Sequence, residues 1–238
     1  MTPVAIKRLS IAVNVCEQVL REVERTSTWS VAHVHMNPLA TSLLHKHEKM
    51  AEIYVITRGH GLLRFGDADH LVGAGSVVHI PTGVPHMLTN LGCGSLEHLV
   101  FALPPFDPED VHMVADDGLT RAIHFLPLPP VQDCFDGAKI VPYSFAQHDL
   151  SIACGWVAND PTRLKQPHYH KNTTEWIYVV EGKGSIEVDG QEIPTCQWDW
   201  LRMEPGTEHA IRNHASEDLV VVCICSPMFS MTDVHYRC

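Results

Sequence analysis

Two stretches of the chain share one pattern: "HKHEKMAEIYVITRGHG" at residues 45–61 and "HYHKNTTEWIYVVEGKG" at residues 168–184. Each begins with two histidines one residue apart, and a glutamate follows five residues after the second histidine. A mostly apolar run, typical of a buried β-strand, then leads to two glycines. The repetition of this pattern determines how the rest of the sequence is read.

The repeat has a fixed offset of 123 residues. The pairs His45/His168, His86/His209 and Asn90/Asn213 all obey it, and an ungapped register holds from 31/154 to 90/213. Self-similarity over this length indicates an internal duplication. We therefore expect two domains, residues 1–130 with an N-terminal extension and residues 131–238.

Each half has the pattern of an all-β domain. Residues 52–67 and 175–193 are apolar runs broken by glycines, and residues 75–90 predict a strand, a Pro-Gly turn and a second strand. The segment 104–137 is rich in Pro and Asp and predicts a connection between the halves. Residues 16–26 fit either a helix or a strand, and we assign them to a strand.

The paired histidines predict metal binding. Alternate residues of a strand face the same side, so both histidines of each pair project together, and a neighbouring glutamate and a third histidine after a Pro/Gly turn complete the set. The candidate ligands are His45, His47, Glu52 and His86, and His168, His170, Glu175 and His209. One His-x-His alone is more simply explained as polar residues on a strand, but two complete sets at one offset favour metal ions. Three imidazoles and one carboxylate leave coordination positions open, unlike most structural zinc sites.

The same residues resemble the two motifs of the cupin superfamily. The matching positions in the first half are His45, His47, Glu52, Gly59, Gly75, Pro81, Gly83, His86 and Asn90. The second half keeps the four ligands, but Trp198 replaces the first motif glycine and Glu204 precedes a displaced Pro205. These departures question the turn that presents His209. The chain thus resembles a bicupin, which implies two tandem double-stranded β-helix (jelly-roll) barrels. Each would hold one divalent transition metal ion, with Fe favoured over Mn, Ni, Cu or Zn.

Strand alternation also gives candidate pocket residues. Thr41 and Tyr54 share a face with the ligands of the first half, and Gln166 does so in the second. His79 and Arg202 are equivalent by the offset, and each either reaches a pocket or points to solvent. Tyr54 is either a wall residue or a proton donor, and Gln166 is either a pocket or a surface residue. We expect these residues to contact a substrate.

The resemblance implies several activities, since bicupins include dioxygenases, decarboxylases, isomerases and aminohydrolases. We favour an oxygenase acting on a small organic molecule, because a neutral three-histidine set in an apolar pocket suits Fe(II) and O2. A non-redox isomerase, decarboxylase or lyase is the alternative, and a non-catalytic metal- or ligand-binding protein is the second. Because the first half keeps every motif position, we expect Glu52 and Tyr54 to be its catalytic residues.

The charge and the apolar content of the sequence limit the kinds of partner that we expect. The formal net charge is −11 and the sequence has no basic cluster, which disfavours nucleic acid. The longest apolar run, residues 219–225, is too short to cross a membrane, and no small-residue cleavage site follows Lys7 and Arg8, so we expect a cytoplasmic protein.

The eight cysteines form no CxxC pair and are expected to be small buried side chains. Aromatic strands around Trp176 and Trp200 suggest a homodimer.

Overall fold

The structure of the chain is a computed structural model that describes residues 2–12, 18–160 and 166–237. It divides into a first unit, residues 8–128, and a second unit, residues 129–238 together with residues 1–7. Cys16, Glu17 and Cys238 lie outside the described residues. Among the described residues, no helix has the length and apolarity needed to cross a bilayer.

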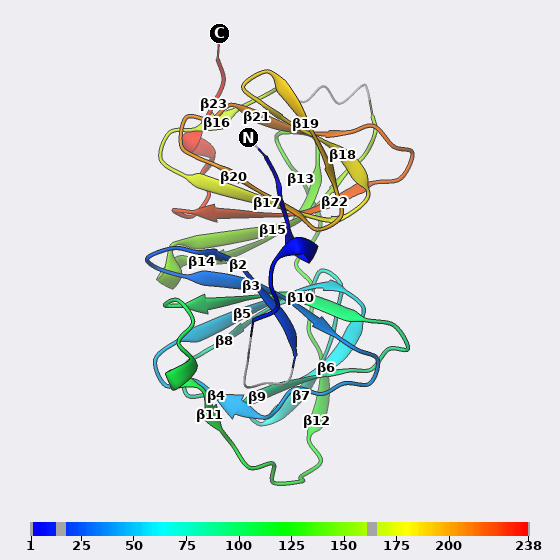
Figure 1. Cartoon of the computed structure of the whole chain (residues 1–238), viewed down its shortest axis with the longest axis vertical. Helices are drawn as coiled ribbons and strands as arrows, with labels where there is room; N and C mark the ends of the chain where they lie inside the picture. Colours follow the sequence, from blue (N-terminus) through cyan, green and yellow to red (C-terminus); the bar gives the residue numbers. More distant parts are fainter. Residues whose placement is uncertain (1, 13–17, 161–165, 238) are drawn as a thin grey trace. The chain divides into compact units, whose positions relative to one another are not determined.

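The first unit consists of two antiparallel-dominated sheets (Figure 1). One sheet has the order β2-β3-β10-β5-β8 and the other β11-β4-β9-β6-β7-β12. Their strands are β2 (Val19–Arg25), β3 (Ser30–Met36), β4 (His45–Lys46), β5 (Ala51–Arg58), β6 (His60–Phe65), β7 (Ala68–Gly73), β8 (Val77–Ile80), β9 (His86–Asn90), β10 (Leu96–Leu103), β11 (His112–Met113) and β12 (Ala122–Phe125). A 3-10 turn, η2 (Pro108–Asp110), precedes β11. The strand assigned to residues 16–26 is confirmed over Val19–Arg25.

The second unit repeats this arrangement. Its sheets have the orders β1-β20-β17-β22-β15-β14-β13, β19-β18-β21 and β16-β23. The strands are β1 (Val4–Ala5), β13 (Gln132–Asp133), β14 (Lys139–Phe145), β15 (Leu150–Val157), β16 (Tyr169–His170), β17 (Thr174–Glu181), β18 (Lys183–Val188), β19 (Gln191–Cys196), β20 (Asp199–Met203), β21 (His209–Asn213), β22 (Leu219–Ser226) and β23 (Val234–His235). The 3-10 turns are η1 (Ile6–Arg8), η3 (Ala146–His148) and η4 (Met231–Asp233). The all-β prediction is confirmed.

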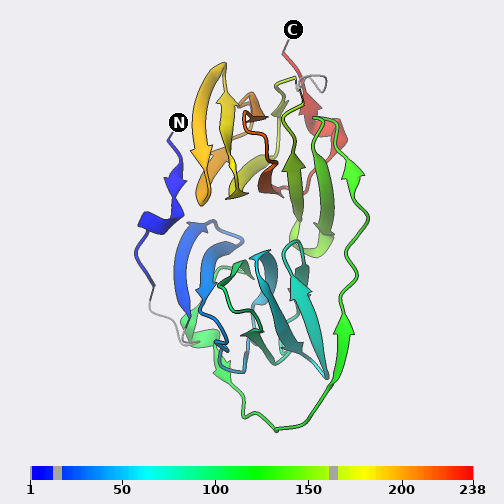
Figure 2. The ribbon, with the colours of Figure 1, turned by 90° about the vertical axis from the view of Figure 1, so that its right-hand side faces the viewer.

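Within each unit the strands curve around an apolar interior (Figure 2). The core of the first unit takes residues from both of its sheets, and most of its members have counterparts in the second core at the 123-residue offset. Three such pairs are Val34/Val157, Leu63/Ile186 and Leu96/Leu219, and all six side chains are fully buried. The duplication therefore extends from the motifs to the packing of the interior.

The N-terminal residues do not extend the first unit as we expected. Strand β1 pairs antiparallel with β20, with Val4 opposite Trp200, and the amide of Ile6 donates to the Trp198 carbonyl at 2.9 Å. Ile6 is fully buried. The backbone of this segment thus pairs with β20 and with the residue that precedes it, and residues 1–7 belong to the second unit.

The aromatic cluster of the second unit is buried within the chain. Trp176, Tyr178 and Trp200 are at most 3% exposed, and Tyr178 lies opposite Trp200 across the β17–β20 ladder. These rings do not offer an exposed surface, so the homodimer remains a prediction without this support.

The turn that presents His209 keeps its shape despite the departures from the motif. Trp198 adopts φ 75°, the left-handed conformation that Gly75 adopts with φ 91° at the equivalent position. The amide of Gly206 donates to the His170 carbonyl at 2.6 Å, as Gly83 does to His47 at 2.5 Å. The shift of His209 that the sequence suggested is therefore absent.

A glycine at the close approach of two strands gives a test of the barrel packing. At Gly61, a Cβ atom would lie 2.5 Å from the Thr89 carbonyl oxygen and 2.7 Å from Leu96 Cδ1, whereas Gly94 has open space. We expect Gly61→Ala to lower the free energy of unfolding by about 1–3 kcal/mol, as overpacking does. Gly94→Ala, measured in parallel by denaturant unfolding, should change it by about 0.5 kcal/mol or less. Equal effects would contradict the packing described.

Candidate metal centres

The first metal centre is formed by short strands that meet inside the first unit. Its residues are His45 on β4, Glu52 on β5, His86 on β9 and His47, which follows β4. All four side chains are buried, and one potential ligand atom from each lies within 4.8 Å of the others. His45 and His86 are direct neighbours across the β4–β9 ladder. The pairing of two short strands thus brings residues 41 positions apart in sequence to one point.

The second metal centre has the same construction. Its residues are His168, His170 on β16, Glu175 on β17 and His209 on β21. His168 and His209 pair through an isolated bridge, with mutual backbone hydrogen bonds of 3.0 and 2.7 Å. The His209 Nε2 atom lies 3.0 Å from Glu175 Oε2, compared with 2.9 Å between His86 Nε2 and Glu52 Oε2 in the first centre. The candidate ligands thus come together in both halves.

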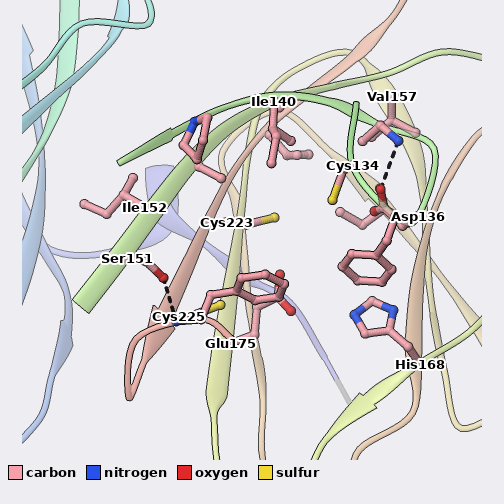
Figure 3. A pocket seen from close by; sticks show the side chains of 18 of the residues that line it. Cys134, Asp136, Ile140, Ser151, Ile152, Val157, His168, Glu175, Cys223 and Cys225 are labelled. Carbon is pink, nitrogen blue, oxygen red and sulfur yellow. Dashed lines mark hydrogen bonds between the residues drawn. The ribbon is translucent and has the colours of Figure 1, made fainter. Parts of the chain in front are cut away.

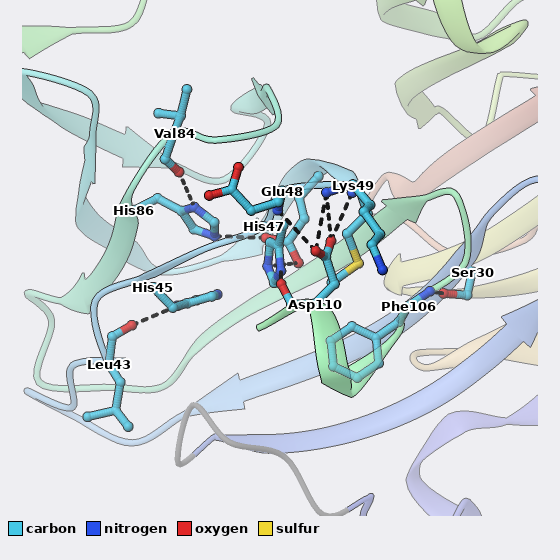
Figure 4. A network of polar contacts seen from close by, with 12 residues as sticks. Ser30, Leu43, His45, His47, Glu48, Lys49, Val84, His86, Phe106 and Asp110 are labelled. Atoms are coloured by element: carbon cyan, nitrogen blue, oxygen red, sulfur yellow. Dashed lines mark hydrogen bonds and ion pairs between the residues drawn. The ribbon is translucent and has the colours of Figure 1, made fainter. Parts of the chain in front are cut away.

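Backbone carbonyls fix the orientation of the imidazoles. In the first centre the Nδ1–H groups donate to the carbonyls of Leu43, Asp110 and Val84 at 2.8, 2.9 and 3.0 Å (Figure 4). In the second centre His170 and His209 donate in the same way at 3.0 and 2.9 Å. Among the described residues, His168 Nδ1 has no such partner. A histidine whose Nδ1 carries the proton presents an Nε2 lone pair.

These lone pairs meet carboxylate oxygens, and this arrangement fits a metal ion. A neutral imidazole Nε2 and a carboxylate oxygen are both acceptors, so they repel each other at short distance. The contacts of His86 with Glu52 and of His209 with Glu175 therefore need a cation that both atoms can bind. A proton or a divalent ion can fill that role. All ligand atoms of a centre lie within 4.8 Å of one another, and two ligands on opposite sides of an ion with bonds of about 2.1 Å would be about 4.2 Å apart. The chain therefore contains two metal-binding His/Glu sites.

Burial keeps part of each ligand set ready for a metal. It lowers the pKa of His45 to about 4 and that of His168 to about 3, with the neighbouring histidines adding to the effect. Burial alone would raise the pKa of Glu52 and Glu175, but the adjacent imidazoles outweigh it and hold both below the usual value. Neutral imidazole and ionised carboxylate are the forms that bind metals.

A buried aspartate supports each centre, and the sequence did not reveal it. The Asp110 carboxylate accepts from the backbone amides of Glu48, Lys49 and Met50 at 2.9–3.1 Å. Its own carbonyl accepts from His47. Asp110 therefore fixes the loop that joins His47 to the strand carrying Glu52.

Asp233 does the same in the second unit. It accepts from the amides of Lys171, Asn172 and Thr173, each at 3.1 Å, and its carbonyl accepts from His170. Asp233 and Asp110 are 123 residues apart, so extending the repeat register beyond Asn213 would have found the pair.

The two centres open onto cavities of different size. The first cavity, of about 60 Å³, is lined by His45, His47, Glu52 and Tyr54, among others. The second, of about 140 Å³, is lined by all four residues of the second metal centre together with apolar and thiol side chains. The larger space therefore lies beside the centre that departs from the motif.

The second cavity contains polar groups that the sequence did not single out. Cys134, Cys223 and Cys225 line it together with Asp136 (Figure 3). Burial raises the pKa of the Cys134 thiol to about 12, with Asp136 adding to the effect, and raises those of Cys223 and Cys225 well above the usual value. The thiols are therefore neutral wall groups at pH 7, as small buried cysteines usually are.

Of the expected pocket residues outside the ligand sets, only Tyr54 lines a cavity. Its ring contacts His86 edge-on, with centroids 6.0 Å apart. Thr41 is exposed and donates to Thr89 Oγ1 at 3.1 Å, and Gln166 is exposed before β16 begins. Both lie outside regular strands, where alternation does not hold.

His79 and Arg202 lie on the opposite strand face from the cavities. Each alternates with buried core residues, Val78 and Ile80 for His79, and Leu201 and Met203 for Arg202. Arg202 pairs with Glu204 at 2.9 Å and lies over the Trp176 ring. The sequence-based expectation that these two residues contact a substrate in the cavities is therefore not met.

Comparison with known families agrees with this architecture. The model of the cupin domain matches the chain twice, at residues 32–101 and 156–225. The chain belongs to the cupin family. With two such domains in tandem it is a bicupin, as the resemblance implied.

Relatives in sequence match only part of the cupin chain. An uncharacterized protein of Methanocaldococcus jannaschii is 36% identical over 73 residues, which is 31% of this chain and 58% of that protein. The L-ectoine synthase of Aliivibrio fischeri is 32% identical over 72 residues, 29% of this chain and 56% of the synthase. The chain thus spans little more than half the length of either relative.

Solved structures match nearly the whole fold. The Lactobacillus farciminis oxalate decarboxylase, solved as a formate complex, gives a TM-score of 0.70 at 16% identity, covering 97% of this chain and 87% of that one. A Bacillus subtilis oxalate decarboxylase variant gives 0.68 at 16% identity, covering 97% and 78%. At these identities the likeness concerns the fold.

Each centre should hold one ion independently. We expect about two transition-metal ions per chain after reconstitution, and one ion in each of the double variants His45→Ala/His47→Ala and His168→Ala/His170→Ala. Elemental analysis of tag-free protein provides the measurement. A wild-type content near zero with Fe, Mn, Ni, Cu and Zn would contradict both sites.

Asp110 should strengthen metal binding at the first centre without binding the metal itself. In the background His168→Ala/His170→Ala, where only the first centre remains, we expect Asp110→Ala to weaken metal affinity by about 10–100-fold. The reason is that three backbone amides of the loop after His47 lose their hydrogen-bond acceptor. The exposed Asp67 provides a control, and Asp67→Ala should leave affinity unchanged. Competition with a chromogenic chelator measures both, and equal affinities would refute the positioning role.

Proposed function

We propose that the chain is a metal-dependent enzyme that acts on a small organic molecule in the second cavity. The observation that carries this proposal is the cavity of about 140 Å³ lined by all four residues of the second metal centre. The solved oxalate decarboxylases and the L-ectoine synthase relative are enzymes by name, which also favours catalysis over storage.

The reaction that we favour is oxygenation with Fe(II). A bound divalent ion would supply open positions where a substrate oxygen and O2 meet. His168, His170, His209 and Glu175 would hold the ion, and the apolar side chains of the cavity would exclude water. One of the solved Bacillus subtilis oxalate decarboxylase structures concerns Mn(II) centres, so Mn is the next candidate ion.

A non-redox reaction is the second candidate, and Asp136 favours it. This carboxylate lines the second cavity without belonging to the ligand set. One of its oxygens accepts from the Ala138 amide at 2.9 Å. A carboxylate in this place can take a proton from a substrate and return it, as many isomerases and lyases require, whereas a decarboxylase needs a proton delivered to the carbon that loses CO2. The solved oxalate decarboxylases share the fold. Dependence of turnover on O2 separates the two candidates.

The place proposed for catalysis differs from the sequence-based one. The complete motif of the first half favoured Glu52 and Tyr54, whereas cavity size favours the second centre. In this account the first centre is a structural or regulatory partner, and Tyr54 fills space beside it. A small-molecule substrate is proposed, and homodimer formation remains a separate prediction, to be tested by light scattering.

Variants of the two glutamates test which centre is catalytic. Once turnover is found, we expect Glu175→Gln to lower it by at least about 100-fold, on the scale of a lost charged active-site group. Glu52→Gln and Tyr54→Phe should retain most of it. Initial rates, measured with metal content, provide the test. The reverse pattern would return the catalytic role to the first centre.

A further inference from the structure

The volume of the second cavity limits what it can hold. A cavity of roughly 150 Å³ with apolar walls accommodates one benzene molecule, and the second cavity has about 140 Å³. The first cavity, at about 60 Å³, has room for roughly four waters. Of these two cavities, only the second has the size of a six-membered ring.

Two phenylalanines form an aromatic wall beside the second metal centre. The rings of Phe135 and Phe229 lie in nearly parallel planes, 9° apart, with centroids separated by 6.1 Å. Phe135 meets His168 edge-on at 4.8 Å, and Phe229 meets His170 edge-on at 5.9 Å. A flat ring placed here would contact aromatic faces or edges at the distances such pairs prefer.

Most of the remaining lining residues are apolar, and the polar exceptions outside the metal centre are Asp136, Tyr143, Ser144 and Ser151. Ile140, Ile152 and Val221 line the cavity, and the sulfurs of Cys134 and Cys223 point into it (Figure 3). Thiols behave as small, polarisable hydrophobic groups when buried. Such walls favour an apolar body over a compact, strongly hydrated one.

We propose that the second cavity binds a ligand built on one planar six-membered ring, carrying an oxygen donor directed at the second metal centre. The inference rests on the proposed function for its location and names the substrate class of that site. The ring would lie against Phe135 and Phe229, and its oxygen substituent would reach the space between His168, His170 and Glu175. A linear dicarboxylate would leave the apolar walls without contact.

Binding to the Zn²⁺-loaded chain tests this proposal without any turnover. Titration calorimetry with benzoate and acetate compares a ring with a small carboxylate that can meet the metal in the same way. We expect benzoate to bind roughly tenfold or more tightly than acetate, because the phenyl group buries additional apolar area. Elemental analysis confirms two ions per chain before each titration.

Variants test whether the aromatic wall causes the preference for benzoate. Phe135→Leu and Phe229→Leu keep an apolar side chain but remove the flat ring, and we expect each to weaken benzoate about threefold or more, on the scale of one aromatic pair. Phe106 lines the first cavity at the position equivalent to Phe229, so Phe106→Leu should leave the affinity for benzoate unchanged. Ala153→Leu, which fills the second cavity, should abolish benzoate binding while metal content stays at two.

Two results would overturn the proposal: acetate binding as tightly as benzoate, or benzoate binding that survives Ala153→Leu. The proposed function fails differently. Benzoate binding in a chain that never turns over a ring compound would leave the ligand class intact and refute catalysis. Turnover of a linear acid without benzoate binding would support catalysis and refute the proposed ligand class.

Discussion

The hydrogen bond from a histidine Nδ1–H to a backbone carbonyl is the interaction on which both metal centres depend. It fixes the ring and its tautomer, so the Nε2 lone pairs converge on one point beside a carboxylate. The carbonyls come from the short segments between strands, and their positions are set by the barrel. Asp110 and Asp233 extend this control, because each contributes a carbonyl to one histidine and a carboxylate to the following loop.

The duplication constrains the two centres equally but not the two cavities. The ligands, the supporting aspartates and the core pairs all keep the 123-residue offset. Side chains around them have diverged. Tyr54 corresponds to Ile177, and Ala32 of the first cavity corresponds to Gly155 of the second. Such losses of volume leave more room in the second barrel, while the scaffold that holds the ligands is unchanged.

The ligands and the fold could be predicted from the sequence because they follow regular spacing. His45 and His47 alternate on a strand, and the second copy repeats them, so their convergence needed no knowledge of tertiary contacts. Thr41 and Gln166 were misplaced because alternation fails where strands end. Arg202 was misplaced although it lies within β20, since the sequence did not show which face of that strand is buried.

Other features depend on tertiary contacts that local pattern does not encode. Asp136 and Phe135 come from an irregular turn after β13, where the Gly137 amide donates to the Cys134 carbonyl, and no period marks such residues. The N-terminal strand pairs with β20, nearly 200 positions away in sequence. Cavity volume likewise depends on side chains from several strands at once. Substrate class therefore had to be inferred from the structure.

X-ray absorption spectroscopy of the chain loaded with Co²⁺ can test whether three imidazoles and one carboxylate bind each ion, because the spectrum reports the ligand atoms around both ions. We expect a shell of nitrogen and oxygen at about 2.0–2.2 Å, with outer-shell scattering from three imidazoles per ion. A sulfur scatterer at about 2.3 Å, from cavity thiols such as Cys223, or scattering from a single imidazole would contradict it.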